Sequence, residues 1–238
     1  MTDPALIWSY LSQEPLLWLT ATLIAYWLGD QFFRRMGRQS WANPVMVAVI
    51  LLALVLWATG TTYQTYFEGA QFVHFMLGPA TVALGMPLYE NLHRVRKAAL
   101  PLIAALVAGS VTTIVSVLLI ARGFGLSDVM LASLAPKSTT APVAIGIAES
   151  LGGEPTITAV LVLLTGMFGA IIATPFLNLL GIRDWRARGF AVGVAAHGIG
   201  TARAFQVNET AGAFASIGMG LNAVLTAIIA PLILHLFQ

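Results

Sequence analysis

Long stretches without a charged residue constrain this chain more than any other feature of its sequence. They cover residues 39–66, 69–89, 98–121, 155–182 and 210–238. Each can supply the ~20 consecutive apolar residues that cross a bilayer as a helix. Only 9% of the residues are charged, against about 25% in a soluble domain, so a soluble protein with a very large core lacks the polar surface it would need. We therefore expect an all-α polytopic membrane protein with one membrane domain over residues 1–238.

The basic residues fall in three short clusters, which set the orientation of the spans. The clusters lie at 34–38, 94–97 and 183–188 and hold nine of the 12 Lys and Arg residues. Short loops rich in Lys and Arg stay on the cytoplasmic side of a membrane. This rule puts the N-terminus and the loops 61–71 and 123–128 outside, with spans at about 15–33, 43–60, 72–92 and 100–121.

The segment 128–153 has to enter and leave on the same side, because a full crossing would move the third basic cluster outside. The stretch from Pro136 to Pro142 divides it into two apolar halves, each too short to span a bilayer alone. A second segment, 190–206, is weakened as a helix by Gly193, Gly198 and Gly200, and it either crosses or re-enters from inside. With two more spans, at about 155–180 and 212–236, the sequence predicts about six full spans and two broken or re-entrant segments.

The two broken segments share a short sequence pattern. Residues 140–141 and 201–202 are both Thr-Ala, with Lys137 before the first pair and His197 before the second. If one segment enters from outside and the other from inside, the two form an inverted repeat, which is frequent in transporters. The alternative is a chance match between two stretches rich in small residues.

The first break is a candidate binding site, because irregular backbone inside a membrane is tolerated where it lines a cavity or is buried in protein. A half-helix that begins near Thr140 and carries Pro142 in its first turn directs unpaired N–H groups and its positive dipole end to the membrane interior. Lys137 adds a full positive charge, and this combination suits an anion such as a carboxylate. The alternative is a proline-kinked helix whose lysine extends to the surface. The candidate residues are Pro136, Lys137, the three helix-capping candidates Ser138, Thr139 and Thr140, and Pro142.

The second break offers a similar set of groups, which are His197, Gly198, Gly200, Thr201 and Arg203. Thr201 is a good helix N-cap, and Arg203 can pair with a carboxylate through two hydrogen bonds. Alternatively, Arg203 is an ordinary charge at the inner surface. His197 titrates near neutral pH, so it can bind an anion or couple transport to a proton; otherwise it is a hydrogen-bonding residue in helix packing.

The positive charges of Lys137 and Arg203 need a negative charge nearby, because each costs at least about 2.5 to 3.5 kcal/mol to insert into a membrane. A substrate anion would compensate them, as would an acidic partner such as Glu90 or Glu149. Glu90 has a second interpretation, in which it marks the inner interface beside the second basic cluster.

Other kinds of site find no support in the sequence. Cysteine is absent and the four histidines have no ligand spacing, so we expect no metal and no cofactor. The patterns G-x-S-x-G, HExxH and the P-loop do not occur, so an enzyme is not expected. The net charge of +2 does not indicate nucleic-acid binding. It comes from basic residues beside the spans, which we expect at the surface of the lipid bilayer. The sequence leaves open whether the chain forms a homo-oligomer.

Five motifs resemble the LrgB/CidB family, and the likeness is strongest over residues 43–236. They are NPVMVA at 43–48, YFEGAQ at 66–71, PATVALGMPLYENL at 79–92, APKSTTAPVAIGIAESLGG at 135–153 and AAHGIGTARAF at 195–205. The Lys-Ser-Thr-Thr and His-Gly-x-Gly-Thr-Ala-Arg runs are specific to it. The longer lead before the first span is the one difference that we find.

The resemblance implies a multi-pass protein of the bacterial inner membrane that works with a small membrane protein of the LrgA/CidA type. Bacterial members have been described as holin-like or antiholin-like modulators of murein hydrolases and autolysis. A plastid relative is a glycolate/glycerate carrier, and some bacterial members are linked to pyruvate uptake. The transport description agrees with an anion site at the two breaks. We therefore expect a secondary transporter of small monocarboxylates, with a modulator of murein hydrolase export as the alternative.

Overall fold

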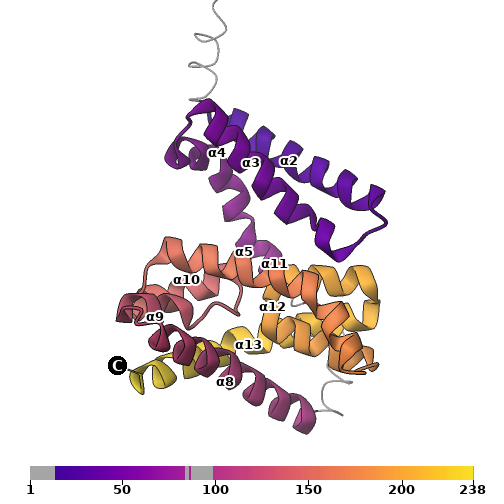
Figure 1. Cartoon of the computed structure of the whole chain (residues 1–238), viewed down its shortest axis with the longest axis vertical. Helices are drawn as coiled ribbons and strands as arrows, with labels where there is room; N and C mark the ends of the chain where they lie inside the picture. The colour runs from indigo at the N-terminus through magenta and orange to yellow at the C-terminus, as the bar shows by residue number, and fades with distance from the viewer. Residues whose placement is uncertain (1–13, 84–85, 87–98, 238) are drawn as a thin grey trace, which may run out of the picture. The chain divides into compact units, whose positions relative to one another are not determined.

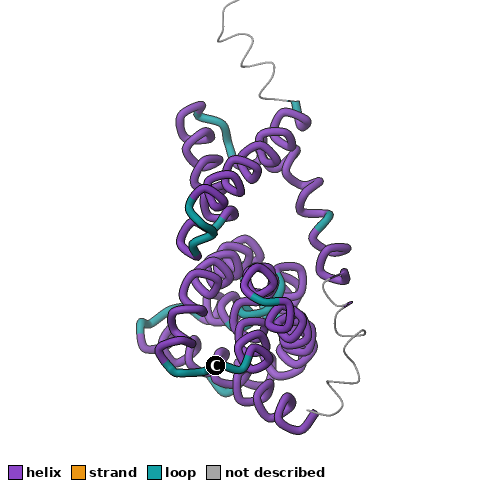
Figure 2. The backbone as a smooth tube through the Cα atoms, turned by 90° about the vertical axis from the view of Figure 1, so that its right-hand side faces the viewer, coloured by secondary structure: helices purple, strands orange, loops and turns teal. Residues whose placement is uncertain are grey.

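The structure is a computed structural model that describes residues 14–83, 86 and 99–237. Within these residues every regular element is a helix (Figure 2). The chain forms two compact units, Met1–Ala80 and Thr81–Gln238, and each is described here by itself. The all-α class is thus confirmed, whereas a single membrane domain over the whole chain stays a prediction.

The first unit contains α2 (Pro15–Arg35), the short 3-10 helix η1 (Ser40–Ala42), α3 (Pro44–Thr59) and α4 (Tyr63–Phe75) (Figure 1). The side chain of Asn43 caps α3 by accepting from the backbone N–H of Val45 at 2.9 Å, and Pro44 follows in the first turn, where its missing N–H costs least. Gly60 ends the helix with a φ of 66°, which glycine adopts without strain. The NPVMVA motif is therefore a helix start.

The prediction of a loop at 61–71 is wrong, because most of this stretch lies in α4; its side of the membrane stays a prediction. Packing against α2 determines this helix. The rings of Tyr66 and Trp18 meet edge to face at 5.9 Å, and the Tyr66 hydroxyl lies 3.2 Å from that of Thr22. At Gly69 a side chain would overlap the carbonyl oxygen of Pro15. The polar residues of this stretch therefore belong to a packed helix, which hydropathy alone does not indicate.

The span predicted at 72–92 is described only in part. The first helix there, α4, ends at Phe75, and α5 covers Leu77–Ala83. Glu90 lies outside the described residues.

The second unit is built around α8 (Ala99–Gly123), α11 (Pro155–Leu179) and α13 (Glu209–His235) (Figure 1). These are the three helices in the described part of the chain that are long and apolar enough to cross a membrane. They match the spans predicted at 100–121, 155–180 and 212–236. Between them lie α9 (Asp128–Leu134), α10 (Ala141–Ser150) and α12 (Trp185–Val207).

One end of the second unit, which we call the basic end, gathers the starts of three helices and the end of a fourth. Arg188 near the start of α12 donates from Nη1 to Oδ1 of Asn178 near the end of α11, at 2.8 Å. The first halves of α8, α12 and α13 pack together there through Leu106, Phe190 and Phe214. Therefore α8 and α13 run in the same direction, and α11 runs in the opposite one.

The opposite end holds both ends of the first broken segment. Leu118, Leu131 and Leu234 pack together there from α8, α9 and α13. The hydroxyl of Ser133, at the end of α9, accepts from the backbone N–H of Glu154 at 2.7 Å. Asp128 at the start of α9 pairs with Arg122 near the end of α8 at 3.1 Å, so both ends of α9 lie here. The chain then turns inward at 135–140, where Ser138 reaches the middle of α13, and returns through α10 to the start of α11.

The second broken segment, α12, is bent at Ala196 and His197. Their backbones are non-helical, with φ/ψ of −127°/15° and 41°/−136°. The bend falls just before Gly198 and after Gly193, so these two predicted helix-weakening glycines flank it.

The two halves of α12 run in opposite directions along α13. Before the bend the contacts pair Gly189 with Ala211 and Gly193 with Ala215; after it they pair Thr201 with Met219 and Phe205 with Gly212. Along α12, the residue number of the contacted position in α13 therefore first increases and then decreases. As a result α12 is a hairpin whose two ends both lie at the basic end.

Glycines allow α12 and α13 to approach backbone to backbone. A side chain at Gly189 or Gly193 would overlap a carbonyl oxygen of α13, and a Cβ at Gly218 would lie 2.6 Å from the carbonyl oxygen of Phe190. Close contact through small residues is the usual way in which helices associate in a membrane.

Candidate functional site

The two broken segments meet at Asn222, in the middle of α13. Its side chain is 1% exposed. Its amide nitrogen donates to the carbonyl oxygens of Ser138 and Val194, each at 3.1 Å. Its amide oxygen accepts from the hydroxyls of Ser110 at 2.6 Å and Thr226 at 3.3 Å. We call this group of five residues the junction.

The junction provides hydrogen bonds to backbone carbonyls that the two breaks leave without partners. The last carbonyls before a helix interruption have no partner within the helix, and a buried polar group without a hydrogen bond costs about 1 to 3 kcal/mol. Ser138 lies in the first break and Val194 lies just before the second. An asparagine amide has two N–H donors, so the single residue Asn222 satisfies one carbonyl in each broken segment and joins the two.

The first break places its candidate residues in or beside the junction. Pro136, Ser138, Thr139 and Thr140 are buried and Lys137 is half-buried, whereas Pro142 is exposed. The hydroxyl of Thr139 donates to the carbonyl of Pro136 at 3.1 Å, and Lys137 Nζ donates to Ser138 Oγ at 3.4 Å. The polar groups of this segment therefore lie inside the protein.

As predicted, α10 begins next to Thr140 and has Pro142 in its first turn. Thr140 occupies the N-cap position, with φ −65° and ψ 145°, but makes no side-chain capping bond. Its hydroxyl oxygen is buried and has no hydrogen-bond partner among the described residues. The first turn of α10 is therefore left without a side-chain cap, and its N–H groups remain able to bind a ligand.

The second break differs in detail from the prediction, because the bend comes earlier. Thr201 does not cap a half-helix: it lies about one turn beyond the bend and is buried, and its hydroxyl donates to the carbonyl of His197 at 2.7 Å. Gly200 is buried beside it, and Gly198 is half-buried.

His197 has the geometry of a packing residue. Its Nε2 lies 2.9 Å from the carbonyl oxygen of Val162 in α11, so this nitrogen is the donor. The ring fills the space over Gly166, where a Cβ would lie 2.6 Å from Cε1.

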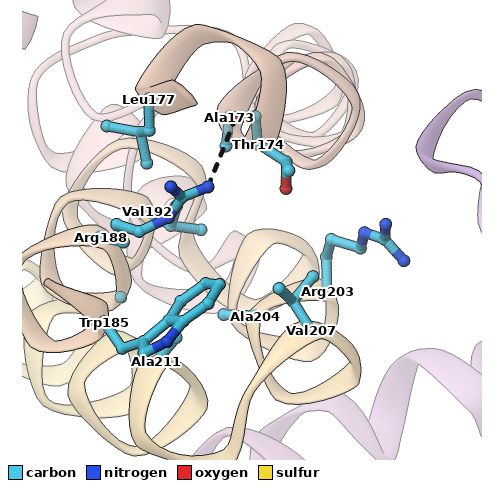
Figure 3. A pocket seen from close by; sticks show the side chains of 11 residues that line it. Ala173, Thr174, Leu177, Trp185, Arg188, Val192, Arg203, Ala204, Val207 and Ala211 are labelled. Carbon is cyan, nitrogen blue, oxygen red and sulfur yellow. Dashed lines mark hydrogen bonds between the residues drawn. The ribbon is translucent and has the colours of Figure 1, made fainter. Parts of the chain in front are cut away.

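Arg203 lies away from the junction. It is about two turns of helix beyond the bend, half-buried, and donates from Nη1 to Oε1 of Gln206 at 3.3 Å. It borders a small pocket at the basic end with Trp185 and Arg188, and its guanidinium points away from Arg188 (Figure 3). This position fits the alternative of a charge near the inner surface. Glu149 is exposed in the last turn of α10, so it does not lie against Lys137 either.

One member of the third basic cluster is buried instead of interfacial. Arg188 is 7% exposed and donates to the carbonyls of Ile182 at 2.9 Å and Thr174 at 3.4 Å, in addition to Asn178. Its guanidinium also lies 4.9 Å from the ring centre of Trp185. The negative end of the α11 dipole favours a cation here, so Arg188 joins the end of α11 to the start of α12.

Asp184 fixes the start of α12 at the same end. Its carboxylate accepts from the backbone N–H of Arg186 at 2.8 Å and from the Arg186 side chain at 2.6 Å. These hydrogen bonds to Arg186 lower the pKa of Asp184 to about 2. The exposed Asp184 and Arg186 are therefore paired with each other.

A cavity of about 570 Å³ starts at the basic end, and one junction residue, Val194, contributes to its wall. It lies between α8 and the first half of α12. Asp184 and Arg186 line it at the basic end, and Thr113 and Val194 line it next to the junction. Its remaining walls are mostly small or apolar side chains.

The sequence analysis did not identify Asn222 or Ser110. A signal was present, since Asn222 is an amide in the charge-free stretch 210–238 and Ser110 lies in the stretch 98–121. A polar residue in the middle of a membrane span marks a functional or packing position. What the sequence could not provide was the pairing of these two residues from different helices.

Comparisons with known proteins agree over nearly the whole chain. The sequence model of the LrgB-like family matches residues 22–236. The uncharacterized protein YxaC of Bacillus subtilis is 38% identical over 195 residues, which are 82% of this chain and 85% of YxaC. The holin-like protein CidB of Staphylococcus epidermidis (strain RP62A) is 31% identical over 94% of this chain and 97% of its own. The antiholin-like protein LrgB of Bacillus mycoides is 30% identical over 93% and 96%. No solved structure matches significantly.

Proposed function

Because this chain belongs to the LrgB-like family of multi-pass membrane proteins and its broken segments meet at one buried amide, we propose that it is a secondary transporter of small monocarboxylates. Glycolate, glycerate and pyruvate represent the substrate class. The observation that carries the proposal is the pair of hydrogen bonds from Asn222 to Ser138 and Val194. Many transporters bind their substrate where two discontinuous helices meet near the middle of the membrane.

The proposed topology has about six full spans and two re-entrant hairpins. The segment α9–α10 enters from outside, and α12 enters from the cytoplasmic side, where its basic residues favour the inner leaflet. Each hairpin follows a long helix, α8 or α11, and these two helices run in opposite directions. Helix plus hairpin, repeated with inverted orientation, is the inverted repeat suggested by the two Thr-Ala pairs. We place the protein in the bacterial inner membrane.

The substrate carboxylate would bind at the start of α10. Pro142 has no N–H, so the first turn presents the N–H groups of Ala141 and Val143, which the positive end of the helix dipole reinforces. Lys137 supplies the countercharge. The ammonium needs an anion nearby, and Glu149 lies too far along α10 to provide one. A bound monocarboxylate would therefore be stabilised by Lys137 and would in turn stabilise it.

The cavity between α8 and α12 is the proposed route from the cytoplasmic side to this site. Its volume of about 570 Å³ is within the range of small-molecule sites. The carboxylate would pass the paired Asp184 and Arg186 and reach the junction beside Val194.

We also propose that the transporter works with a small membrane protein of the LrgA/CidA type. The family resemblance supports this partner. A second function, modulation of murein hydrolase export and autolysis, is favoured by the names of two relatives, a holin-like CidB and an antiholin-like LrgB. A catalytic function is not proposed, since the family is not a known enzyme family.

Uptake into proteoliposomes tests the transport proposal. The purified protein, with and without an LrgA-type partner, is reconstituted and supplied with labelled glycolate, pyruvate or lactate. Saturable uptake of at least one acid, competed by the other two, is the expected result. If none of the acids is taken up saturably under either condition, transport is contradicted and the murein hydrolase function becomes the better account.

A further inference from the structure

Thr140 lies in the first break, two residues after the junction residue Ser138, and it is the one described residue whose buried hydroxyl oxygen lacks a hydrogen-bond partner. The residue is 5% exposed. The two preceding hydroxyls along the chain are engaged: Thr139 donates to the carbonyl of Pro136, and Ser138 accepts from Lys137. A buried hydroxyl without a partner is unfavourable, so this one is available to a ligand.

The Thr140 hydroxyl lacks the hydrogen bond that a threonine at the start of a helix usually makes. A threonine at an N-cap commonly accepts from the N–H of the second or third residue of the helix. Thr140 occupies the N-cap of α10, a helix of 10 residues, and makes no such bond. Within the described part of the chain its hydroxyl has no partner, and the N–H groups of Ala141 and Val143 lie in the adjacent first turn, where a helix provides no intrahelical acceptor.

A 2-oxygenated carboxylic acid matches this pair of features. Its carboxylate and its 2-oxygen sit on adjacent carbon atoms, so the carboxylate can accept from the helix N–H groups while the 2-oxygen meets the neighbouring side chain. A threonine hydroxyl can both donate and accept. It can therefore donate to a keto oxygen and accept from a hydroxyl, and one site can hold acids of both kinds.

We propose that Thr140 is a specificity-determining residue that selects 2-hydroxy and 2-keto acids over acids without a 2-oxygen. This inference rests on the proposed function and assigns the choice of substrate to one hydroxyl. An acid without the 2-oxygen, such as acetate, leaves the Thr140 hydroxyl buried and unpaired. A site that hydrogen-bonds a substrate oxygen rejects analogues that lack it for this reason.

The test compares Thr140→Val, which keeps the shape and removes the hydroxyl, with Thr140→Ser, which keeps the hydroxyl. Thr20→Val is a matched control on α2, where the hydroxyl donates to the carbonyl of Leu16. Uptake of labelled glycolate into proteoliposomes is competed with unlabelled glycolate or acetate, and the ratio of the two inhibition constants is measured. Reconstituted protein is quantified, so that poor folding of a variant is distinguished from altered selectivity.

The unmodified protein and Thr20→Val are expected to prefer glycolate, and Thr140→Ser should retain most of that preference. In Thr140→Val the glycolate-to-acetate preference should fall by about tenfold, with acetate affinity kept. An unchanged ratio in Thr140→Val would overturn this inference and leave the transport proposal in place. Absence of uptake by the unmodified protein would instead contradict the transport proposal itself.

Discussion

The amide nitrogen of Asn222 lies 3.1 Å from the carbonyl oxygen of Ser138, and this hydrogen bond ties the long helix α13 to the break in the first hairpin. The same nitrogen binds Val194 before the bend of the second hairpin. Because Asn222 holds both segments, neither break can change its position without affecting the other. This coupling is a physical basis for a binding site that two half-helices share.

Replacing Asn222 should therefore affect the whole junction. In Asn222→Leu the carbonyls of Ser138 and Val194 lose their donor, and interhelical hydrogen bonds in membranes are worth about 0.6 to 1.7 kcal/mol each. We expect the unfolding free energy in detergent to fall by about 1 to 3 kcal/mol and uptake to be lost. Ser110→Ala removes a single hydrogen bond to the same side chain and should have a smaller effect. Equal stability of Asn222→Leu and the unmodified protein would contradict the role of the junction.

Gly193 should be far less tolerant of substitution than Gly220. In Gly193→Ala the added Cβ overlaps the carbonyl oxygen of Ala215, whereas a Cβ at Gly220 meets open space. Forcing extra atoms into a packed contact typically costs about 1 to 3 kcal/mol. Gly220→Ala is expected to be neutral or to stabilise the helix slightly.

Thermal unfolding of both glycine variants in the same detergent checks this prediction. Gly220→Ala also serves as the matched control, because both glycines belong to the contact-forming pair α12 and α13. A melting temperature that drops equally in the two variants would mean that α12 and α13 do not approach as closely as described.

The sequence predicted the long spans and the two interrupted segments because these features depend on local composition. Charge-free stretches determine α8, α11 and α13, and the Pro136–Pro142 stretch interrupts the helix by itself. The sequence analysis failed for α4, because this helix is stabilised by contacts of Gly69 with Pro15 and of Tyr66 with Trp18. Such contacts join residues far apart in the chain.

The candidate site was predictable to a similar degree. Residues 137–140 are where the sequence analysis expected them, inside a break and largely buried. Arg203 matches the second of the two positions that the sequence analysis left open for it, because the bend falls at Ala196 and His197 and so leaves Arg203 about two turns away. Glycine content indicated a weak helix but not the residue at which it turns. Asn222 was missed because its importance comes from its partners in three other segments.

Lys137 and Arg203 should respond differently to substitution. Lys137→Ala removes the countercharge beside the start of α10 and is expected to lower uptake by at least about tenfold, since a buried charge pair contributes more than an exposed one. Lys137→Arg should retain part of the activity. Arg203→Ala removes a charge at the basic end and should reduce uptake less, mainly at low substrate concentration and low salt.

Initial rates of labelled substrate uptake, normalised to inserted protein, test this pair. A larger loss in Arg203→Ala than in Lys137→Ala would move the anion site to the basic end. Full activity in Lys137→Ala would remove Lys137 from the site.

From the two hairpins we predict which residues face the same side of the membrane. If α9–α10 is re-entrant, single cysteines in Leu126→Cys and Glu154→Cys react with a membrane-impermeant maleimide from one side. If α12 is a hairpin, Arg183→Cys and Gln206→Cys both react from the other side. The chain has no cysteine, so each variant carries a single reactive thiol. Labelling of 126 and 154 from opposite sides would require α9 and α10 to form a complete crossing. That crossing would reverse the orientation of α11 and carry Arg183 and Arg188 outside, against the preference of basic loops for the cytoplasm.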